Sequence, residues 1–219
     1  MKAINRDILR EVSRTKSKFI SIMIIMFLGV FIFVGLKETS PAMVNTYNKY
    51  IERHKMYDLR VSHSYGVNDS DMKIINDFDN IDISESYYIK KLQITNSNKF
   101  VNVESIPEKL VLPKVVEGTL PSDESEIALV ESLQGSYKIG DEISFVSSNN
   151  DSNTLKQFKF RVVGFVQGAD HIEVSNNNLA NKDYFGYVKR NVFKFENVSG
   201  VNIKLKNINY KYSDKDYIT

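Results

Sequence analysis

One uninterrupted apolar run, from Phe19 to Leu36, constrains this chain more than any other feature. Its 18 residues include no charge and no proline, and Ser21 is the only polar side chain. As an α-helix the run would be roughly 27 Å long, close to the thickness of the hydrocarbon core of a bilayer. A helix that is apolar on every side for this length does not suit the surface of a soluble domain. The sequence therefore predicts one transmembrane helix at 19–36, with Leu28 and Gly29 near its centre.

A cleaved signal peptide is the main alternative for this run. Signal peptides have an apolar core of about 7–15 residues, followed by a cleavage site of small residues. Here the core is longer, and the residues after it, 37–41, read KETSP. We therefore expect an uncleaved anchor. Gly29 and Gly35 are six residues apart, so they do not form the four-residue spacing of a helix-packing motif. They either allow a close helix approach or are simply tolerated.

Basic residues are concentrated before the apolar run. Arg10, Arg14, Lys16 and Lys18 precede it closely, whereas only Lys37 follows it closely. Because positive charge accumulates on the cytoplasmic side of membrane helices, the N-terminus is expected in the cytoplasm and 37–219 outside it.

Residues 1–18 also have an amphipathic pattern. On a helical wheel Ile4, Ile8, Leu9 and Val12 share an arc of about 140°. The opposite side is basic, with Arg6, Arg10 and Arg14. Such a segment fits either a short helix on the inner membrane surface or a plain basic flank.

Composition limits what the remaining chain can be. The whole chain has 219 residues, a net charge of +2 and no cysteine. Residues 37–219 are enough to bury a core, which must rely on packing because no disulfide can form. The low net charge gives no indication of a nucleic-acid partner. An extracytoplasmic domain without cysteine fits a bacterium better than a eukaryotic secretory pathway.

The pattern after the apolar run predicts an α+β domain. Residues 38–57 either continue the membrane helix or form a short helix after Pro41. A helix at 71–78 is expected, capped by Asn68 or Ser70. Residues 116–121 read as a turn and 132–137 as a short helix or turn. Strands are expected at 58–62, 86–95, 99–104, 126–130, 142–146, 158–166, 187–195 and 201–205.

Alternation within the last of these strands predicts which side chains face inward. Val201, Ile203 and Leu205 are expected to point into the core, whereas Asn202 and Lys204 are expected to point outward. The asparagine-rich segment 147–154 reads as a solvated loop, and the tail, 207–219, is polar.

Five segments resemble a known family when they are taken together. They are RDILREVSRTKSKFISIMIIMFLGVFIFVGLKETSPAM (6–43), YDLRVSHSYGVNDSDM (57–72), EGTLPSDESEIAL (117–129), YKIGDEISF (137–145) and FKFRVVGFV (158–166). In order and spacing, over 6–205, they resemble the N-terminal part of FtsX-like ABC transporter permeases with a MacB-type extracytoplasmic core domain.

The resemblance implies an outer domain that lies between the first and second membrane helices, and a separate cytoplasmic ATPase whose hydrolysis moves that domain. It also implies a permease homodimer. This chain ends before a second apolar run, so the domain at 37–219 is expected to be incomplete at its C-terminus. A truncated gene product, part of a split gene and an anchored relic all fit that expectation.

Catalytic motifs are absent from the sequence. There is no phosphate-binding G-x-x-x-x-G-K-[ST] loop, no cysteine nucleophile and no G-x-S-x-G elbow. The chain is therefore expected not to be an enzyme, and we predict no catalytic residue, no cofactor site and no metal site.

Several local patterns have simple structural explanations. The pair His171 and Glu173 fits a surface pair better than a metal site. Residues 68–71 fit a helix cap better than a calcium loop. Gly118 and Gly140 are expected in turns, with a hinge role as the alternative. The carboxylates Asp123, Glu124 and Glu126 are expected to be solvated.

The leading hypothesis is the N-terminal part of an ABC permease in a bacterial cell membrane, with the lipid bilayer, a separate ABC ATPase and a second permease copy as partners. An alternative is a stand-alone anchored binding or sensor module that presents its outer domain to an extracellular peptide or an envelope protein. An anchored hydrolase is a third hypothesis, which would need catalytic groups clustered in a cleft.

Overall fold

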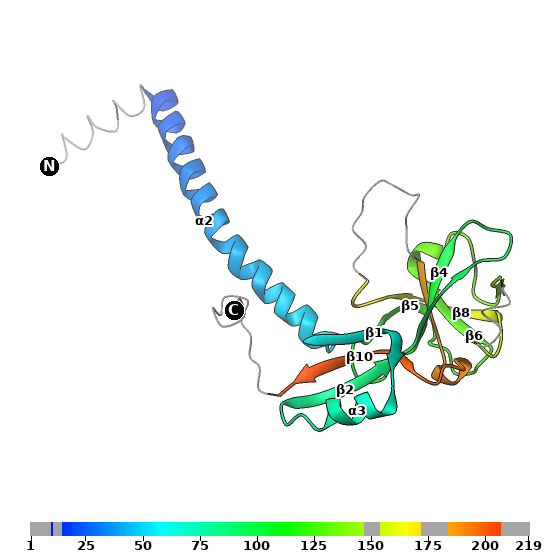
Figure 1. Ribbon diagram of the computed structural model, residues 1–219. Coiled ribbons are helices and arrows are strands. Elements are labelled where there is room, and N and C mark those ends of the chain that lie inside the picture. Colours follow the sequence, from blue (N-terminus) through cyan, green and yellow to red (C-terminus); the bar gives the residue numbers. More distant parts are fainter. Residues whose placement is uncertain (1–9, 11–14, 147–153, 172–183, 207–219) are drawn as a thin grey trace. The chain divides into compact units, whose positions relative to one another are not determined.

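The computed structural model describes residues 10, 15–146, 154–171 and 184–206. The chain divides into two units, Met1–Tyr50 and Ile51–Thr219, which are described separately. The expected fold class is confirmed: a long apolar N-terminal helix is followed by a mixed α+β domain (Figure 1).

Helix α2, Lys16–Arg53, contains the whole apolar run and continues beyond it. Of the two alternatives for 38–57, the continuous helix is observed, because Pro41 lies inside α2 without ending it. Proline removes one backbone hydrogen bond from a helix interior. Around it, the hydroxyls of Thr39 and Thr46 donate to the carbonyls of Gly35 and Ala42 at 2.7 and 2.8 Å. No side chain of α2 is buried, and α2 is long and apolar enough to cross a membrane.

The second unit begins with a three-stranded antiparallel sheet in the order β1-β10-β2. Helix α3, Asp69–Asn76, packs Met72 and Ile75 against the buried Val201 and Ile203 of this sheet (Figure 1). Asn68 caps α3 in a complete capping box, as one of the two expected alternatives. The strands are β1 (Leu59–Val67), β2 (Ile81–Tyr87) and β10 (Val198–Leu205).

A bulge interrupts β1. Ser62 pairs with Gly200 and the next paired residue, Val67, pairs with Val198, so that 63–66 leave the ladder. Gly66 has a φ of +80° at this bulge. A Cβ there would lie 2.7 Å from the side chain of Asn197, which explains the glycine.

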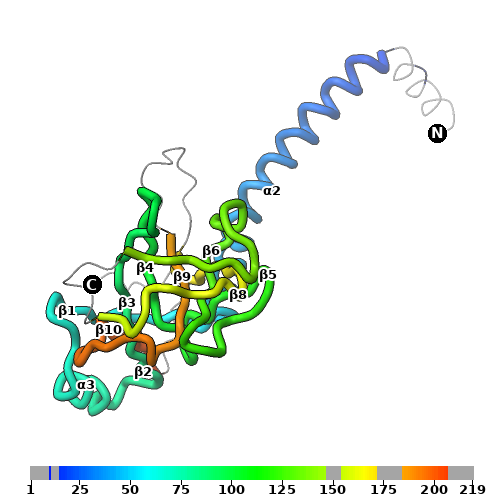
Figure 2. The backbone as a smooth tube through the Cα atoms, turned by 90° about the vertical axis from the view of Figure 1, so that its right-hand side faces the viewer, coloured from blue at the N-terminus to red at the C-terminus, as the bar shows by residue number. Residues whose placement is uncertain are grey.

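The remaining strands form a mixed sheet that closes on itself. Its order is β3-β4-β9-β6-β8, with β5 and β7 pairing with β8. A bridge between Ile94 and Phe145 joins the end of β3 to the end of β7, which completes a small barrel. Figure 2 shows β4, β9 and β6 next to one another in this barrel. The bounds are β3 (Ile89–Gln93), β4 (Phe100–Ser105), β5 (Lys114–Gly118), β6 (Glu126–Val130), β7 (Glu142–Ser144), β8 (Lys159–Gln167) and β9 (Tyr184–Val188).

The barrel encloses the main hydrophobic core. All five residues of β6 are buried, and the expected strand at 126–130 is confirmed with the same bounds. Two short 3₁₀ helices, Glu131–Leu133 and Arg190–Val192, follow β6 and β9. The largest fully buried side chains include Tyr187, Phe160 and Phe165.

Three sequence-based expectations were wrong in detail. The strand expected at 86–95 is two strands, because the chain leaves the three-stranded sheet after Tyr87 and enters the barrel at Ile89. The turn expected at 116–121 instead contains the end of strand β5. The strand expected at 187–195 ends at Val188 and is followed by a 3₁₀ helix. The loop at 147–154 lies, except for Thr154, outside the described residues, as does the tail.

Candidate functional site

A group of four charged or titratable side chains lies where the three-stranded sheet meets the barrel. We call this group the ionic joint and define it by four residues: Arg60, Glu104, Asp170 and His171. Arg60 comes from β1 and Glu104 from β4, whereas Asp170 and His171 follow β8. The joint therefore connects segments that are far apart in the sequence.

Arg60 is the link from the three-stranded sheet. Its Nη2 lies 2.6 Å from Oδ2 of Asp170, and its Nε donates to Oδ1 of Asn202 at 2.7 Å. The guanidinium also lies over the rings of Tyr57 and Tyr87, 4.5 and 4.9 Å from their centroids. Burial alone would lower the pKa of Arg60, but the hydrogen bond and the charge of Asp170 outweigh it and raise the pKa. Arg60 is thus held as a cation with its planar group fixed on several sides.

His171 is the link to the barrel. Its ring stacks on Phe185 of β9, with centroids 4.1 Å apart and planes at 13°. Its Nε2 lies 3.1 Å from Oε1 of Glu104 and 3.8 Å from Oδ1 of Asp170. The histidine therefore sits between two carboxylates, one from its own segment and one from β4.

Two tyrosines border the joint. Burial raises the pKa of Tyr87, against the opposing charge of Arg60. Burial likewise raises the pKa of Tyr187 on β9 well above 10.0, with further increases from the charges of Glu104 and Asp170. Both rings are therefore neutral at ordinary pH and act as walls and hydrogen-bonding groups, not as charges.

A second contact between the sheet and the barrel is aromatic. The ring of Tyr88, between β2 and β3, stacks with Phe193 and Phe195 at centroid distances of 5.2 and 6.1 Å. Arg190 lies 4.9 Å above the Tyr88 ring and donates to the carbonyl and hydroxyl oxygens of Ser86. We call Tyr88, Arg190, Phe193 and Phe195 the aromatic joint.

The loop 106–113 ties the start of the second unit to β2. The carboxylate of Glu85 accepts from the backbone N–H groups of Glu108, Lys109 and Leu110, at 2.6 to 3.2 Å. The next two N–H groups, of Val111 and Leu112, donate to the carbonyls of Lys55 and His54. Val111 adopts a φ of +57°, which is unusual for a β-branched residue. Residues that directly follow α2 are thereby fixed to the rest of the unit.

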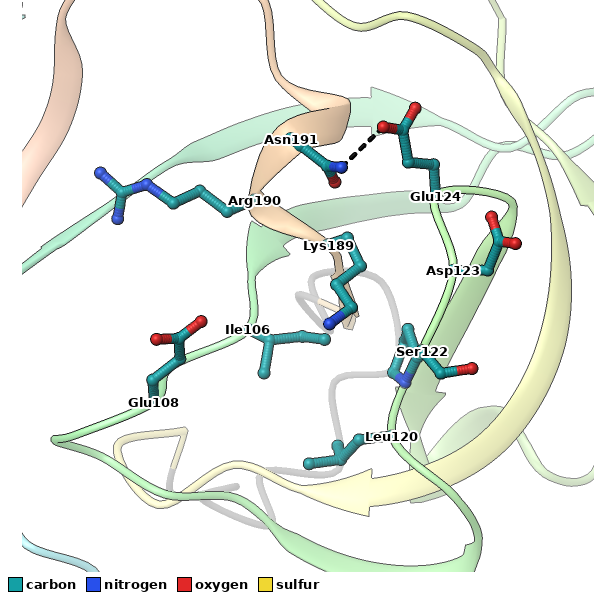
Figure 3. A pocket seen from close by; sticks show the side chains of 10 residues that line it. Ile106, Glu108, Leu120, Ser122, Asp123, Glu124, Lys189, Arg190 and Asn191 are labelled. Atoms are coloured by element: carbon teal, nitrogen blue, oxygen red, sulfur yellow. Dashed lines mark hydrogen bonds between the residues drawn. The ribbon is translucent and has the colours of Figure 1, made fainter.

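A cavity of about 710 Å³ lies on the barrel beside the aromatic joint (Figure 3). Lys189 points into it between Ile106 and Ser122, and Asn191 donates to Glu124 at 2.6 Å on its rim. The other lining residues are Glu108, Leu120, Pro121, Asp123 and Arg190. The lining combines apolar side chains with charges of both signs.

The expected membrane residues lie on α2 with exposed side chains. Phe19, Leu28 and Leu36 are 49, 54 and 72% exposed. A Cβ added at Gly29 or Gly35 would have nothing within 4 Å, so neither glycine is required by a contact within the described chain.

The basic residues before the run are described only in part. Arg10, Lys16 and Lys18 are exposed. Arg6 and Arg14 lie outside the described residues, so the amphipathic pattern of 1–18 stays a prediction.

Two local expectations were wrong, and the pairing of His171 with Glu173 stays a prediction. Glu126 is buried, because its carboxylate accepts from Ser122 and Asp123 and pairs with Arg161 at 2.7 Å. The hydrogen bond from the Ser122 backbone, the largest cause, lowers the pKa of Glu126. Asn202 is also buried, since it accepts the bond from Arg60. His171 pairs with Glu104; the expected partner, Glu173, lies outside the described residues.

Of the two glycines expected in turns, Gly140 lies in a turn, whereas Gly118 is the last residue of strand β5. Gly118 and Gly140 have φ values of +75° and +97°. A Cβ on Gly118 would lie 2.2 Å from the carbonyl oxygen of Val163, so this position requires glycine for two reasons. Among the described residues no group of three or more histidine, aspartate or glutamate side chains has a geometry that could hold a metal ion.

Sequence reasoning missed the ionic joint. Arg60 and Glu104 each lie in a predicted strand, but nothing local marks them as partners of Asp170 and His171, which are 110 and 67 positions away. The available signal was weak: an arginine in a strand directly after Tyr57, and an Asp-His pair at the end of the strongest predicted strand.

Comparisons with known proteins do not assign this chain to a family. No protein-family model matches this sequence, and no curated protein matches it. Among solved structures, one similar chain is the extracellular domain of the noncanonical ABC-type transporter YknZ from Gram-positive bacteria. The two are 10% identical, with a TM-score of 0.45, over 67% of this chain and 76% of that one. A similarity of this size assigns neither fold nor function to this chain.

Proposed function

We propose that this protein is the membrane-anchored outer domain of an ABC-permease-like assembly. The observation that carries the proposal is α2: its apolar side chains, such as Phe27 and Leu36, are about 70% exposed. An apolar surface of this extent needs an apolar surrounding, and a bilayer supplies one over 19–36.

The basic residues support an orientation. Arg10, Lys16 and Lys18 are exposed before the apolar run, and with Arg6 and Arg14 they favour a cytoplasmic N-terminus. Residues 37–219 then form the extracytoplasmic part of a bacterial membrane protein. Under this proposal the partners are the bilayer, a separate ABC ATPase and a second permease copy.

The attachment of the chain after α2 supports a mechanical role. His54 and Lys55 are bonded through their carbonyls to Leu112 and Val111, and the same loop is held by Glu85 of β2. A displacement of residues 54–55 therefore acts directly on the three-stranded sheet through hydrogen bonds. We propose that this is how motion from a separate ATPase reaches the outer domain, and that the chain itself has no catalytic function.

Membrane fractionation with protease accessibility tests the proposal. In intact cells that express the full chain with an epitope tag at each end, the protein should sediment with membranes. Protease added outside should remove the C-terminal tag and spare the N-terminal tag. A cytosolic product, or an N-terminal tag lost first, contradicts the proposal. Co-purification with a Walker-motif ATPase encoded beside the gene tests the permease assignment separately.

A stand-alone anchored binding module is the second candidate, and the cavity beside the aromatic joint favours it. Lys189 inside the cavity and the carboxylates at its rim could engage both termini or charged side chains of a peptide. Full chain in nanodiscs should then bind a charged peptide library in a manner that Lys189→Ala abolishes. Lys138→Ala, at an exposed position, is the matched control and should bind the library as the wild-type chain does.

A further inference from the structure

We propose that the cavity beside the aromatic joint binds the carboxyl-terminal residue of a peptide, with the terminal carboxylate on Lys189 and an apolar side chain against Ile106 and Leu120. This inference rests on the second candidate function, a binding module, and narrows it from charged peptides in general to one kind of chain end.

The register of the barrel strands brings three loops together at the cavity. Strands β4 and β9 are parallel, with Ser105 opposite Val188, so the residues that follow them lie at the same end of the barrel. Strand β6 is antiparallel to β9, so the residues that precede β6 lie at this end as well. The lining residues come from these three segments, 106–108, 120–124 and 189–191.

Hydrogen bonds within the second unit fix the walls of the cavity. The N–H of Ile106 donates to the carbonyl of Val188 at 3.0 Å. The buried carboxylate of Glu126 accepts from the backbone N–H groups of Ser122 and Asp123, at 2.8 and 3.2 Å. Walls that are held in this way need little reorganisation when a ligand binds, which lowers the cost of association.

Lys189 brings an uncompensated positive charge into the cavity. Its side chain is half-buried and points between Ile106 and Ser122 (Figure 3). Within the described residues its ammonium group has neither a hydrogen bond nor an ion pair. A partly desolvated ammonium group gains from a charge-assisted hydrogen bond, so an anion that reaches its Nζ atom should be bound there.

Neighbouring side chains of the lining are engaged with other partners. Glu124 pairs with Lys156 at 3.1 Å and accepts from Asn191 at 2.6 Å. Arg190 donates to the carbonyl and hydroxyl oxygens of Ser86, at 2.8 and 2.6 Å. The ammonium group inside the cavity is therefore available to a ligand, whereas these side chains would first have to give up bonds.

The lining suits a singly charged anion with an apolar body. Ile106 and Leu120 are half-buried and pack against the barrel core, and Pro121 beside them is buried. The carboxylates of Glu108 and Asp123 also line the cavity. Because like charges repel, one carboxylate on an apolar residue fits this lining better than a phosphate group or a run of acidic residues.

Polar groups at the edge of the cavity favour a peptide over a fatty acid. Ser122, Asp123 and Asn191 bring a hydroxyl, a carboxylate and an amide group to the lining. Peptide N–H and C=O groups can form hydrogen bonds with such groups, whereas an alkyl chain would remove them from water without compensation. The volume of about 710 Å³ is sufficient for a chain end of a few residues.

Calorimetric titration of the full chain in nanodiscs tests the inference. The probe is an N-acetylated pentapeptide that ends in leucine with a free carboxylate, and it is compared with the same peptide as a carboxyl-terminal amide. We expect the amide to bind at least about tenfold more weakly, because it lacks the charge that pairs with Lys189. Lys189→Met, which keeps an apolar stem, should bind both peptides equally weakly. Lys138→Met, at an exposed position, is the matched control and should keep the wild-type preference.

Further probes separate the alternatives. Serine in place of the terminal leucine should weaken binding by roughly fivefold, because less apolar surface is buried. Equal binding of acid and amide by the wild-type chain overturns this inference, as does tighter binding of decanoate or of an amidated peptide with an internal aspartate. These outcomes leave a binding function of the cavity in place. If neither these probes nor the charged peptide library bind, the second candidate function fails together with the inference.

Discussion

Helix α2 and the second unit differ in which side chains they expose and which they bury. The apolar residues of α2 are exposed, with Phe27 at 70%, and none of its residues is buried. The second unit instead buries polar groups, among them Glu126 at 7% and Asn202 at 5% exposed. Each of these buried groups is bonded to a partner from its own unit. The comparison shows that α2 requires an apolar surrounding that the described chain does not provide, whereas the second unit itself supplies partners for the buried Glu126 and Asn202.

Charged substitutions in the apolar run should have the largest effect, because they remove the apolar surface that distinguishes α2 from the second unit. Leu28→Arg combined with Ile32→Arg places two cations at the centre of the expected span, at a cost of about 5–7 kcal/mol for the pair. We expect most of the protein to leave the membrane fraction or to be degraded, as measured by sedimentation and immunoblotting. Thr46→Arg combined with Asn48→Arg adds the same charge beyond the run and should not change the fractionation. Unchanged sedimentation of the first variant would refute the membrane role of α2.

Substitution of a closely packed glycine in the second unit should have the next largest effect. Gly118→Ala places a methyl group 2.2 Å from a backbone carbonyl at a φ of +75°. We expect a loss of about 3 kcal/mol in the free energy of unfolding, measured by denaturant titration of the full chain in micelles. Gly135→Ala is the matched control, because a Cβ there meets nothing within 4 Å and the change should be neutral or slightly stabilising. Equal effects of the two substitutions would contradict the described strand β5.

Removal of Arg60, the cation that β1 contributes to the ionic joint, tests how much the internal polar partners stabilise the second unit. Arg60→Ala leaves Asp170 without its 2.6 Å partner and Asn202 without its donor. Since Arg60 is partly exposed, we expect a loss of about 2 kcal/mol, and about half of that for Arg60→Lys, which keeps the charge without the planar fork. Lys159→Ala breaks the exposed pair with Glu142 and should cost less than about 0.5 kcal/mol. A loss for Arg60→Ala no larger than this control would show that the ionic joint contributes little.

The smallest effect should appear in the dependence of stability on pH at the acidic end. The pKa of Glu126 is lowered, first by the backbone N–H of Ser122, so its stabilisation is present above pH 4.5 and is lost as the pH falls through the lower folded-state value. Glu126→Gln should flatten the dependence of the unfolding midpoint on pH below 4.5. The variant Glu142→Gln, at an exposed pair, should keep the wild-type profile. An identical acid profile for all three proteins would show that Glu126 does not contribute.

Local patterns predicted the parts of the fold that depend on local chemistry. The apolar run predicted α2, and the mainly apolar segment 126–130 predicted β6. The cap at Asn68 predicted α3 within two residues of its observed bounds. Each of these features depends on neighbouring residues alone. The break at Tyr88 was missed because it depends on which sheet each strand joins, and both halves have the same strand-like composition.

The candidate site could not be predicted from such patterns. Asn202 read as exposed because its partner, Arg60, is distant in the sequence. Glu126 has two nearby donors, Ser122 and Asp123, but its burial depends on the assembled barrel. Glu104 and His171 likewise come from separate segments that the barrel brings together. Polar residues are placed by three-dimensional partners, so a sequence reveals the residue types of a joint but not their pairing.

The bulge in β1 has a consequence for many copies of this protein in one membrane. When two copies collide, an exposed edge strand of one could pair with an edge strand of the other. Beyond Ser62 the chain leaves the ladder, and a continuous run of free backbone groups is interrupted there. On the β1 side of this sheet, a neighbouring copy therefore finds only a short stretch to which a further strand could be added.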